Sequence, residues 1–332
     1  MNFSFVELSE EQRRQYVDAE RLFLALEAAE EDAWKYRGSL FWREQAGNRY
    51  LIHLLPDSRQ RSLGRESEAL RAKFEHFTQR KPKAEQRVKE LRETADTMKR
   101  LNRALRVGRT PDIVIDVIHA LRKARVVQHF LLVGTNALYA YESAAGVRFP
   151  HEVMATRDAD FLFDTRRRAE FVQVMEQRGT SFLELLRKAD KTFERHPTDN
   201  HTAVNSKGYE VDIIRRFPPP ELEATEHPLR MTEDEGDLWA MRATTGQQLL
   251  SVPKFKQVVI GTSGAMASMI TVHPLAFARI KRSLSKQRQR SALKAPKDKL
   301  QADMVEELVR QYLPHLAEQP SHNDDQHGAD DH

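Results

Sequence analysis

The sequence predicts an α+β fold: an α/β core with a small mixed sheet, preceded by a region of helices and a β-hairpin and followed by C-terminal helices. Three observations support this prediction. Between residues 112 and 215, short apolar runs alternate with helical patterns, which is typical of strands covered by helices. Long stretches before this core carry apolar residues at helical spacing, and so do two stretches after it.

Changes in composition divide the chain into four parts. We expect an N-terminal region over residues 1–108, a core over residues 109–220, and a C-terminal hairpin with helices over residues 221–317. Residues 318–332 are acidic and polar, and we expect this tail to be disordered because it cannot bury enough apolar surface to fold.

The composition excludes several classes of protein. Of the 332 residues, 40% are hydrophobic and 31% are charged, which suits a soluble globular protein rich in surface helix. The chain has no run of about 18 apolar residues, so we expect no membrane span. It contains no cysteine, which excludes disulfides, cysteine zinc sites and thiol nucleophiles. Residues 1–5 do not resemble the start of a secretory signal, and we expect a cytoplasmic protein.

The N-terminal region begins with an amphipathic helix pattern over residues 9–35. Ser9 and Gln12 resemble a capping box at its start. Two apolar runs follow and are separated by Gly47-Asn48, a pattern that predicts a β-hairpin from strands at residues 39–42 and 50–55. We expect a linker at Ser62–Gly64.

A second helical region follows that linker. Pro82 interrupts its apolar pattern, so we expect a break in the helix there. Beyond the proline, spacings of four and three alternate in a heptad seam with one polar member: Ala84, Val88, Leu91, Ala95, Met98, Asn102 and Leu105. The seam could pair two chains in a dimer, but about three heptads are short for an independent coiled coil and favour a helical hairpin within one chain.

Strand and helix patterns alternate through the core. Short apolar runs predict strands at residues 130–133, 159–163 and 209–215. Helical patterns lie at residues 112–127, 137–141 and 166–177. In the C-terminal part we expect a hairpin from residues 255–260 and 265–271, and helices at residues 274–289 and 299–315.

The turn Gly134-Thr135-Asn136 joins the first core strand to a helix. A glycine at a strand end allows the backbone to approach a ligand closely. The free N–H groups that open the next helix favour an anion such as phosphate, and the Thr135 hydroxyl adds a donor. A glycine turn is also common between a strand and a helix that bind no ligand.

Three aspartates lie on or beside the later core strands. Asp158 and Asp160 are two positions apart, so in a strand both carboxylates point to one face. Asp212 lies between apolar neighbours in the third strand, where an unpaired carboxylate is costly. Oxygen ligands of this kind favour Mg²⁺ or Mn²⁺. The alternatives are an exposed strand end, or a salt bridge from Asp212 to Arg215 or Arg157.

Two stretches of the chain are strongly basic. From Arg65 to Arg109 there are fourteen Lys and Arg against seven Asp and Glu, and from Arg279 to Lys299 there are nine against one. Such stretches attract polyanions, either nucleic acid or nucleotide phosphates. Each is also compatible with a solvated helix face. Because both flank the candidate site, a polyanionic substrate is favoured.

The order of three segments along the chain resembles the motifs of the polymerase-β-like nucleotidyltransferase superfamily: Gly134-Thr135, then Asp158-Ala159-Asp160, then Asp212. Five longer segments are similar to a bacterial nucleotidyltransferase-fold family within it: residues 36–39, 132–142, 156–160, 208–212 and 274–278. One departure is that Asp158 lies 23 positions after Thr135, a longer interval than is usual, which an inserted loop or a longer helix would absorb.

The resemblance implies transfer of a nucleotide from a nucleoside triphosphate, such as ATP, to an acceptor hydroxyl. The three aspartates would bind Mg²⁺ or Mn²⁺ and catalyse, residues 134–136 would bind the nucleotide, and Lys281 would contact the triphosphate. Lys281 could equally be a surface lysine in a basic helix. The acceptor could be RNA, most plausibly tRNA, or a protein, in a toxin–antitoxin or phage-defence role.

A different class of function stays open beside this one: a catalytically inactive protein of the same fold that binds nucleic acid or a protein partner. The presence of all three acids argues against it. A P-loop enzyme or a protein kinase is poorly supported, because the chain lacks both glycine-rich phosphate motifs.

Overall fold

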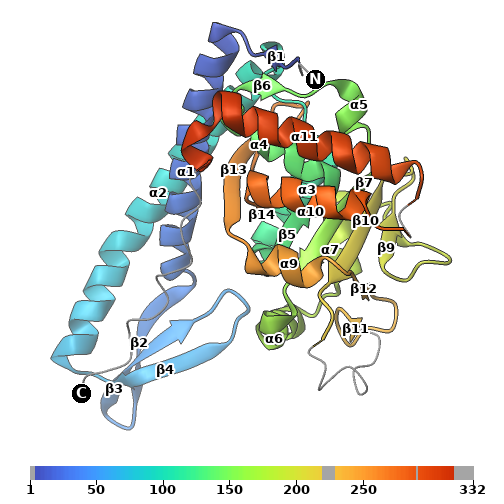
Figure 1. The fold of residues 1–332 in the computed structure, drawn as a ribbon. Helices are drawn as coiled ribbons and strands as arrows, with labels where there is room; N and C mark the ends of the chain where they lie inside the picture. The colour runs from blue at the N-terminus through green and yellow to red at the C-terminus, as the bar shows by residue number, and fades with distance from the viewer. Residues whose placement is uncertain (1–3, 219–228, 289–290, 318–332) are drawn as a thin grey trace, which may run out of the picture. The chain divides into compact units, whose positions relative to one another are not determined.

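A computed structural model of the protein describes residues 4–218, 229–288 and 291–317 (Figure 1). The chain forms two compact units. The sheet unit contains Met1–Leu8, Arg109–Gly261 and Ala267–His332, and the hairpin unit contains Ser9–Gly108 and Thr262–Met266. The expected disordered tail, residues 318–332, lies outside the described residues. Within the described ranges, no helix is both long and apolar enough to cross a membrane.

Two long helices, α1 (Glu10–Lys35) and α2 (Glu68–Ala104), dominate the hairpin unit. The capping box predicted at Ser9 and Gln12 is confirmed, since each side chain bonds the other residue's backbone N–H. An apolar seam joins the two helices and confirms the predicted helical hairpin; it is formed by Leu26, Ala29, Ala33, Val88, Leu91 and Ala95.

The predicted break at Pro82 is wrong, because α2 runs through it. A proline inside a helix removes one hydrogen bond and costs about 3 kcal/mol. Buried Phe77 and Ala84 lie on either side of Pro82, so packing holds both halves of the helix in line. Tertiary burial therefore outweighs the local preference of the chain.

A three-stranded antiparallel sheet completes the hairpin unit, with β2 (Ser39–Gln45), β3 (Asn48–Leu54) and β4 (Gln60–Arg65). The predicted hairpin is confirmed, but its turn is Ala46-Gly47, where both residues have positive φ. Two residues with positive φ are what a tight two-residue hairpin requires. The linker expected at Ser62–Gly64 is wrong, because these residues belong to β4, whose polar side chains hid the strand pattern.

The sheet unit is built on a mixed sheet whose central strands are β5 (Phe130–Val133), β7 (Asp158–Phe163) and β10 (Glu210–Arg215). Strand β5 is antiparallel to β7, and β7 is parallel to β10. The order is β11-β12-β10-β7-β5, with β9 also paired to β10 and β8 to β9. The predicted fold class and all three predicted core strands are therefore confirmed.

The remaining strands of the sheet unit are mostly short. They are β1 (Val6–Glu7), β6 (Val147–Arg148), β8 (Glu194–Arg195), β9 (Thr202–Val204), β11 (Leu229–Arg230), β12 (Trp239–Arg242), β13 (Lys254–Ile260) and β14 (Met266–Val272). The last two pair with each other and confirm the hairpin expected in the C-terminal part.

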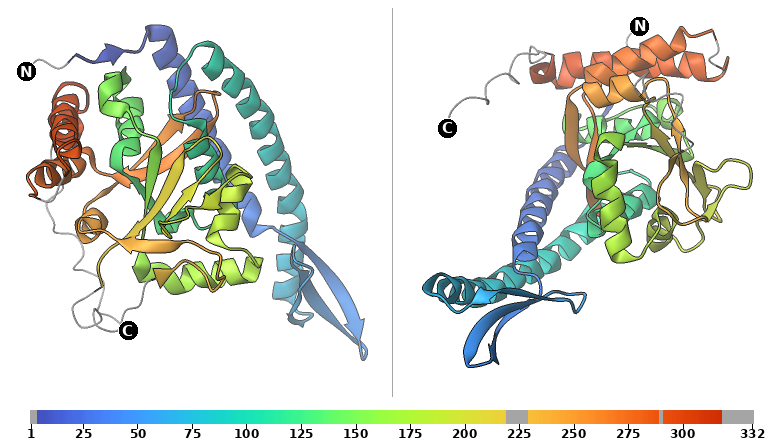
Figure 2. Two further views of the ribbon diagram at one scale, coloured as in Figure 1. Left: turned by 90° about the vertical axis from the view of Figure 1, so that its right-hand side faces the viewer. Right: turned by 90° about the horizontal axis from the view of Figure 1, so that it is seen from below.

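Five described helices of this unit lie where the sequence pattern predicted a helix but differ at their ends: α3 (Asp112–Lys123), α4 (Leu138–Ala145), α6 (Arg168–Arg178), α10 (Pro274–Ser285) and α11 (Lys294–Tyr312). Three more were not predicted: α5 (His151–Met154), α7 (Phe182–Ala189) and α9 (Gly246–Ser251). Short 3-10 turns lie at Val127–His129, Gly134–Ala137, Thr165–Arg167 and Pro314–Leu316. Helices α10 and α11 run close together along one side of the sheet unit in every view (Figures 1 and 2).

A buried carboxylate holds α7 in place. Asp237 is fully buried and accepts hydrogen bonds from the backbone N–H groups of Phe182 and Leu183, at 3.0 and 2.9 Å, and from the Thr232 hydroxyl at 2.6 Å. These bonds satisfy the first free donors of the helix. Asp237, from the acidic stretch before β12, thus caps the N-terminus of α7, a role that no pattern in the sequence indicated.

Candidate active site

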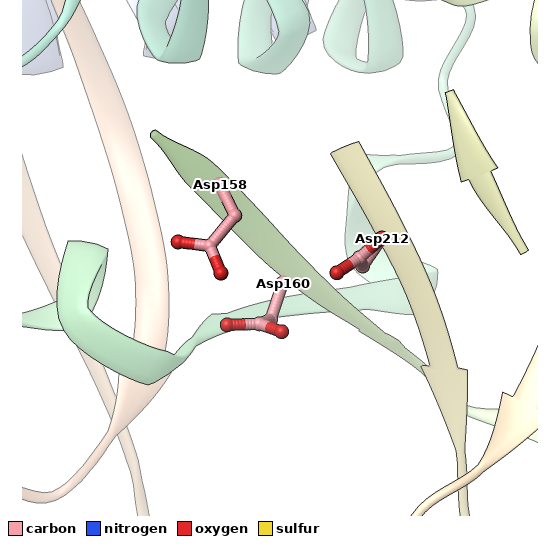
Figure 3. A group of neighbouring side chains, drawn as sticks. All are labelled: Asp158, Asp160 and Asp212. Carbon is pink, nitrogen blue, oxygen red and sulfur yellow. The ribbon is translucent and has the colours of Figure 1, made fainter. Parts of the chain in front are cut away.

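The three predicted aspartates lie together on adjacent strands of the sheet. In the parallel pair of β7 and β10, Asp160 is directly opposite Asp212, and Asp158 is opposite Glu210. Because side chains alternate along a strand, Asp158, Asp160 and Asp212 share one face. One carboxylate oxygen of each lies within 4.8 Å of the others, and Figure 3 shows the three side chains converging on one space. We call this group the acidic triad.

Two threonines hold the outer members of the triad. The Thr156 hydroxyl donates to the carboxylate of Asp158. The Thr202 hydroxyl, on the neighbouring strand β9, donates to Asp212 at 2.5 Å, and Thr202 is itself buried. Both bonds fix carboxylate orientation without supplying any positive charge. The negative charge of the triad therefore stays uncompensated by these partners.

The pKa of Asp160 shows the electrostatic cost of this arrangement. Burial raises the pKa of this carboxyl to about 7, and the negative charges of Asp158 and Asp212 add to the rise. The positive charges of Lys281 and Lys294 act in the opposite direction and only partly offset it. Three half-buried carboxylates gathered in this way fit a divalent cation bound through oxygen ligands, such as Mg²⁺ or Mn²⁺.

Gly134 is placed where only a glycine fits. It follows Val133, the partner of Asp160 in the antiparallel pair of β5 and β7. Its φ is +66°, and an added Cβ would lie 2.1 Å from Oδ2 of Asp160. The backbone of the turn therefore runs against the acidic triad, and a larger residue at Gly134 would displace a carboxylate.

The other two turn residues are buried and have partners in the surrounding structure. The Asn136 amide donates to the backbone carbonyl of Asp158 at 2.6 Å, which ties the turn to the start of β7. The Thr135 hydroxyl accepts a hydrogen bond from the Gln301 side chain of α11 at 3.2 Å. Thr135 and Asn136 thus lie next to the triad, as the motif order suggests.

Lys281 lies on α10 and pairs with Asp298 of α11 at 2.7 Å. Both side chains are largely buried. The positive charge of Lys281 lowers the pKa of Asp160, against the larger effect of burial. Because its amine is largely buried and paired with Asp298, Lys281 is not a solvent-exposed surface lysine.

Helix α11 brings further residues to the site that the motif comparison did not identify. Lys297 donates to the carbonyl of Ala155 at 2.5 Å, and burial lowers the pKa of its amine. Lys294 lies one turn earlier on the same helix. The basic run in the sequence signalled both lysines. Gln301 carried no signal, because its partner Thr135 is 166 positions away.

The long interval between Thr135 and Asp158 has a structural explanation. Helix α4 ends at Gly146, whose left-handed backbone stops the helix. Strand β6 and the short helix α5 then fill the rest of the interval before β7 begins. The extra residues form additional elements beside the site, and the order of the three motif segments is kept.

A family model described as nucleotidyltransferase matches residues 112–323, well over half of the chain. The matched span includes the glycine turn, the acidic triad, α10 and α11. No curated protein and no solved structure matched the chain. The extent of the family match, together with the geometry of the triad, shows that the chain belongs to this nucleotidyltransferase family.

Proposed function

We propose that the protein transfers a nucleoside monophosphate from a nucleoside triphosphate to the hydroxyl of an acceptor, with Mg²⁺ or Mn²⁺ as the cofactor. The observation that carries the proposal is the acidic triad, with its three carboxylates within 4.8 Å on two parallel strands. Membership of the nucleotidyltransferase family supports the same chemistry. A protein that only bound its partner would have no use for three repelling carboxylates at one place.

Asp158, Asp160 and Asp212 are the residues that would hold the cofactor. When bound, a divalent cation supplies neutralising charge for the phosphates and lowers the cost of charge that develops during transfer. The raised pKa of Asp160 supports this assignment, because a cation would relieve the repulsion that raises it. The threonine bonds to Asp158 and Asp212 keep the outer carboxylates in place for binding.

The reaction forms and breaks one bond each at the α-phosphorus. The acceptor oxygen bonds to the α-phosphorus, while the bond from that phosphorus to the bridging oxygen of the β-phosphate breaks. Pyrophosphate leaves with that electron pair. The proton of the acceptor hydroxyl passes to the carboxylate of Asp212, which Thr202 orients.

The triphosphate is bound on the side of the triad formed by the turn Gly134–Asn136 and α11. The positive charges of Lys281 and Lys294 lower the pKa of Asp160, and the negative charge of Asp158 raises the pKa of Lys297. Three amines around an anionic site stabilise the phosphate oxygens of the substrate. Close backbone approach at Gly134 lets the triphosphate lie against the strand end.

The test is transfer of label from a nucleoside triphosphate that carries the label at its α-phosphate. Purified protein is incubated with Mg²⁺, each of the four ribonucleoside triphosphates in turn, and either total tRNA or a cell lysate. We expect acid-insoluble label with the wild-type protein and none with Asp160→Asn. The control variant Asp18→Asn alters an exposed aspartate of α1 and should transfer as the wild type does.

Label at the γ-phosphate provides a second control, because nucleotidyl transfer releases it with pyrophosphate. Transfer of γ-label would indicate a kinase instead. Equal α-label transfer by wild type and Asp160→Asn would remove the triad from the mechanism and contradict the proposal.

A further inference from the structure

A pocket of about 610 Å³ lies where strand β10, which carries Asp212, changes partner from β9 to β12. Its volume is within the range of about 300–1,000 Å³ that is typical of small-molecule sites. All the lining residues belong to the sheet unit: Asn200, His201, Arg215, Trp239, Ala240, Met241 and Arg242. The family resemblance assigns no role to any of them.

The pocket is connected to Asp212 through the backbone of β9. His201 lines the pocket, and the next residue, Thr202, bonds the carboxylate of Asp212. The Ile213 N–H donates to the His201 carbonyl at 3.0 Å, and the Trp239 N–H donates to the Asn200 carbonyl at 3.0 Å. Met241 is opposite Ile214, which is two residues beyond Asp212 on β10, so Met241 lies on the same face of the sheet as Asp212.

The pocket lies on the side of the triad away from the proposed triphosphate site. The strand order is β5, β7, β10, β12, so the glycine turn after β5 and the pocket at β12 are on opposite sides of β7 and β10. Helix α11 contacts Thr135, which lies in the turn after β5. Among the triad, Asp212 is the member on the strand next to the pocket.

The lining offers a flat apolar platform with cationic groups. Trp239 is half-buried, with Arg230 at 5.8 Å over its ring. Met241 has 44% of its surface exposed, so its side chain is accessible to a ligand in the pocket. The seven lining residues include neither an aspartate nor a glutamate but two arginines, of which Arg215 is buried and donates to the Ala240 carbonyl at 3.0 Å. A partly exposed aromatic ring beside cationic side chains is the combination on which nucleic-acid bases stack.

We propose that this pocket receives the terminal nucleoside of a nucleic-acid acceptor, and this inference rests on the proposed nucleotidyl transfer. The base stacks at Trp239 and Met241, and Arg242 lies close to the acceptor phosphates. The hydroxyl of the bound nucleoside is then directed toward Asp212. That oxygen bonds to the α-phosphorus, its proton passes to Asp212, and pyrophosphate leaves. A serine or tyrosine acceptor would not need the cationic aromatic platform.

The fluorescence of Trp239 provides a direct binding test. The chain has three tryptophans, and the other two, Trp34 and Trp42, lie in the hairpin unit. In the Trp34→Phe/Trp42→Phe variant, emission comes from Trp239 alone. The probes are an RNA trinucleotide with a free 3′-hydroxyl, a non-hydrolysable ATP analogue with Mg²⁺, and a peptide containing serine and tyrosine.

We expect the RNA trinucleotide to quench Trp239, and saturating ATP analogue to leave this quench in place. Quenching by the ATP analogue alone would show that the pocket takes the donor base and would overturn the proposal. Quenching by the peptide alone would assign a protein acceptor and would also overturn it. So would the absence of quenching by all three probes.

A second measurement uses the anisotropy of a fluorescein-labelled RNA and does not depend on tryptophan emission. Trp239→Ala should weaken binding about fivefold or more, because loss of an aromatic base-stacking partner costs about 1–3 kcal/mol. Met241→Ala should weaken binding by a smaller factor, because the methionine offers only apolar contact to the base. Leu101→Ala is the matched control, since Leu101 of α2 is an apolar side chain with a similar exposed fraction of 42%. Equal binding by all three variants would contradict the proposal.

Asp160→Asn in the single-tryptophan background separates the two proposals. The RNA quench should persist in this variant, because Asp160 does not line the pocket. Quenching without label transfer in the wild type would contradict the proposed function alone. Label transfer to RNA without quenching would contradict the pocket proposal alone.

Discussion

Polar groups are buried in both units of the protein, but their hydrogen-bonding and electrostatic environments differ. In the hairpin unit, Asn102 of α2 is buried, and its amide donates to the Gly264 carbonyl at 3.1 Å and accepts from Gln15 at 2.9 Å. In the sheet unit, three carboxylates are gathered with a raised pKa at Asp160. The hydrogen bonds of the first site are satisfied within the chain, whereas the charge of the second is only partly offset by nearby lysines.

Buried polar groups without sufficient compensating charge indicate a functional site better than satisfied ones do. A satisfied buried amide specifies the pairing of two helices and needs nothing else. Carboxylates that repel one another stay close together only if a bound ligand offsets the repulsion or the surrounding packing holds them in place. Substitutions at the two sites should therefore have different consequences for activity and for stability.

Replacing Asp160 with asparagine should abolish most activity. We expect label transfer to fall about a thousandfold or more, since a metal-centred site supplies several kcal/mol to the transition state. The fold should remain intact, because asparagine has nearly the same shape. Circular dichroism and the α-label assay together check this outcome. A loss of less than tenfold would place Asp160 outside the chemistry.

Replacing Asp237 with alanine should cause the largest loss of stability. This fully buried carboxylate bonds two backbone N–H groups of α7 and the Thr232 hydroxyl. We expect a loss of about 2–3 kcal/mol in the free energy of unfolding, because buried donors lose their charged acceptor. Urea denaturation measures it. A midpoint unchanged from the wild type would mean that water replaces the carboxylate.

Replacing Gly134 with alanine should damage activity and stability together. The new Cβ would lie 2.1 Å from the Asp160 carboxylate, and φ at this position is +66°. We expect a loss of about 1–2 kcal/mol from the left-handed backbone, together with a fall in label transfer from the displaced carboxylate. Gly179→Ala is the matched control, since its φ is +56° but nothing lies within 4 Å of the added Cβ. Equal activity in the two variants would show that the close approach at Gly134 is unimportant.

Replacing Asn102 with alanine should have the smallest effect. The Gly264 carbonyl and the Gln15 side chain each lose a partner, and we expect a loss of about 1–2 kcal/mol in stability. Specific label transfer per folded molecule should not change, because Asn102 belongs to the hairpin unit. Thermal unfolding and the α-label assay measure the two properties separately. A fall in activity without a fall in stability would contradict this division.

The sequence predicted the parts of the fold that depend on local pattern. Apolar runs identified β5, β7 and β10, because strands covered on both faces leave a continuous signal. The order of the glycine turn and the three aspartates predicted that these residues would lie together. The pattern could not supply the register that places Asp212 opposite Asp160, since register depends on the assembled sheet.

Other features depend on partners far away in the sequence. Strands β9 and β12 are short and lack a clear alternation, yet they complete the edge beside Asp212. The bond between Gln301 and Thr135 and the cap that Asp237 places on α7 join residues 166 and 55 positions apart. Pro82 shows the reverse case, in which a strong local signal is overridden by packing.

The central claim is that the acidic triad binds a divalent cation, and thermal unfolding at pH 8 with and without Mg²⁺ tests it most directly. A carboxyl whose pKa is raised on folding destabilises the protein increasingly as pH rises from its unfolded value, near 4, through about 7. At pH 8 without metal, Asp160→Asn should therefore have a higher Tm than the wild type. Mg²⁺ should raise the Tm of the wild type by at least about 2 °C and leave the variant unchanged. An equal Mg²⁺ effect on both proteins, or a lower metal-free Tm for Asp160→Asn, would contradict the claim.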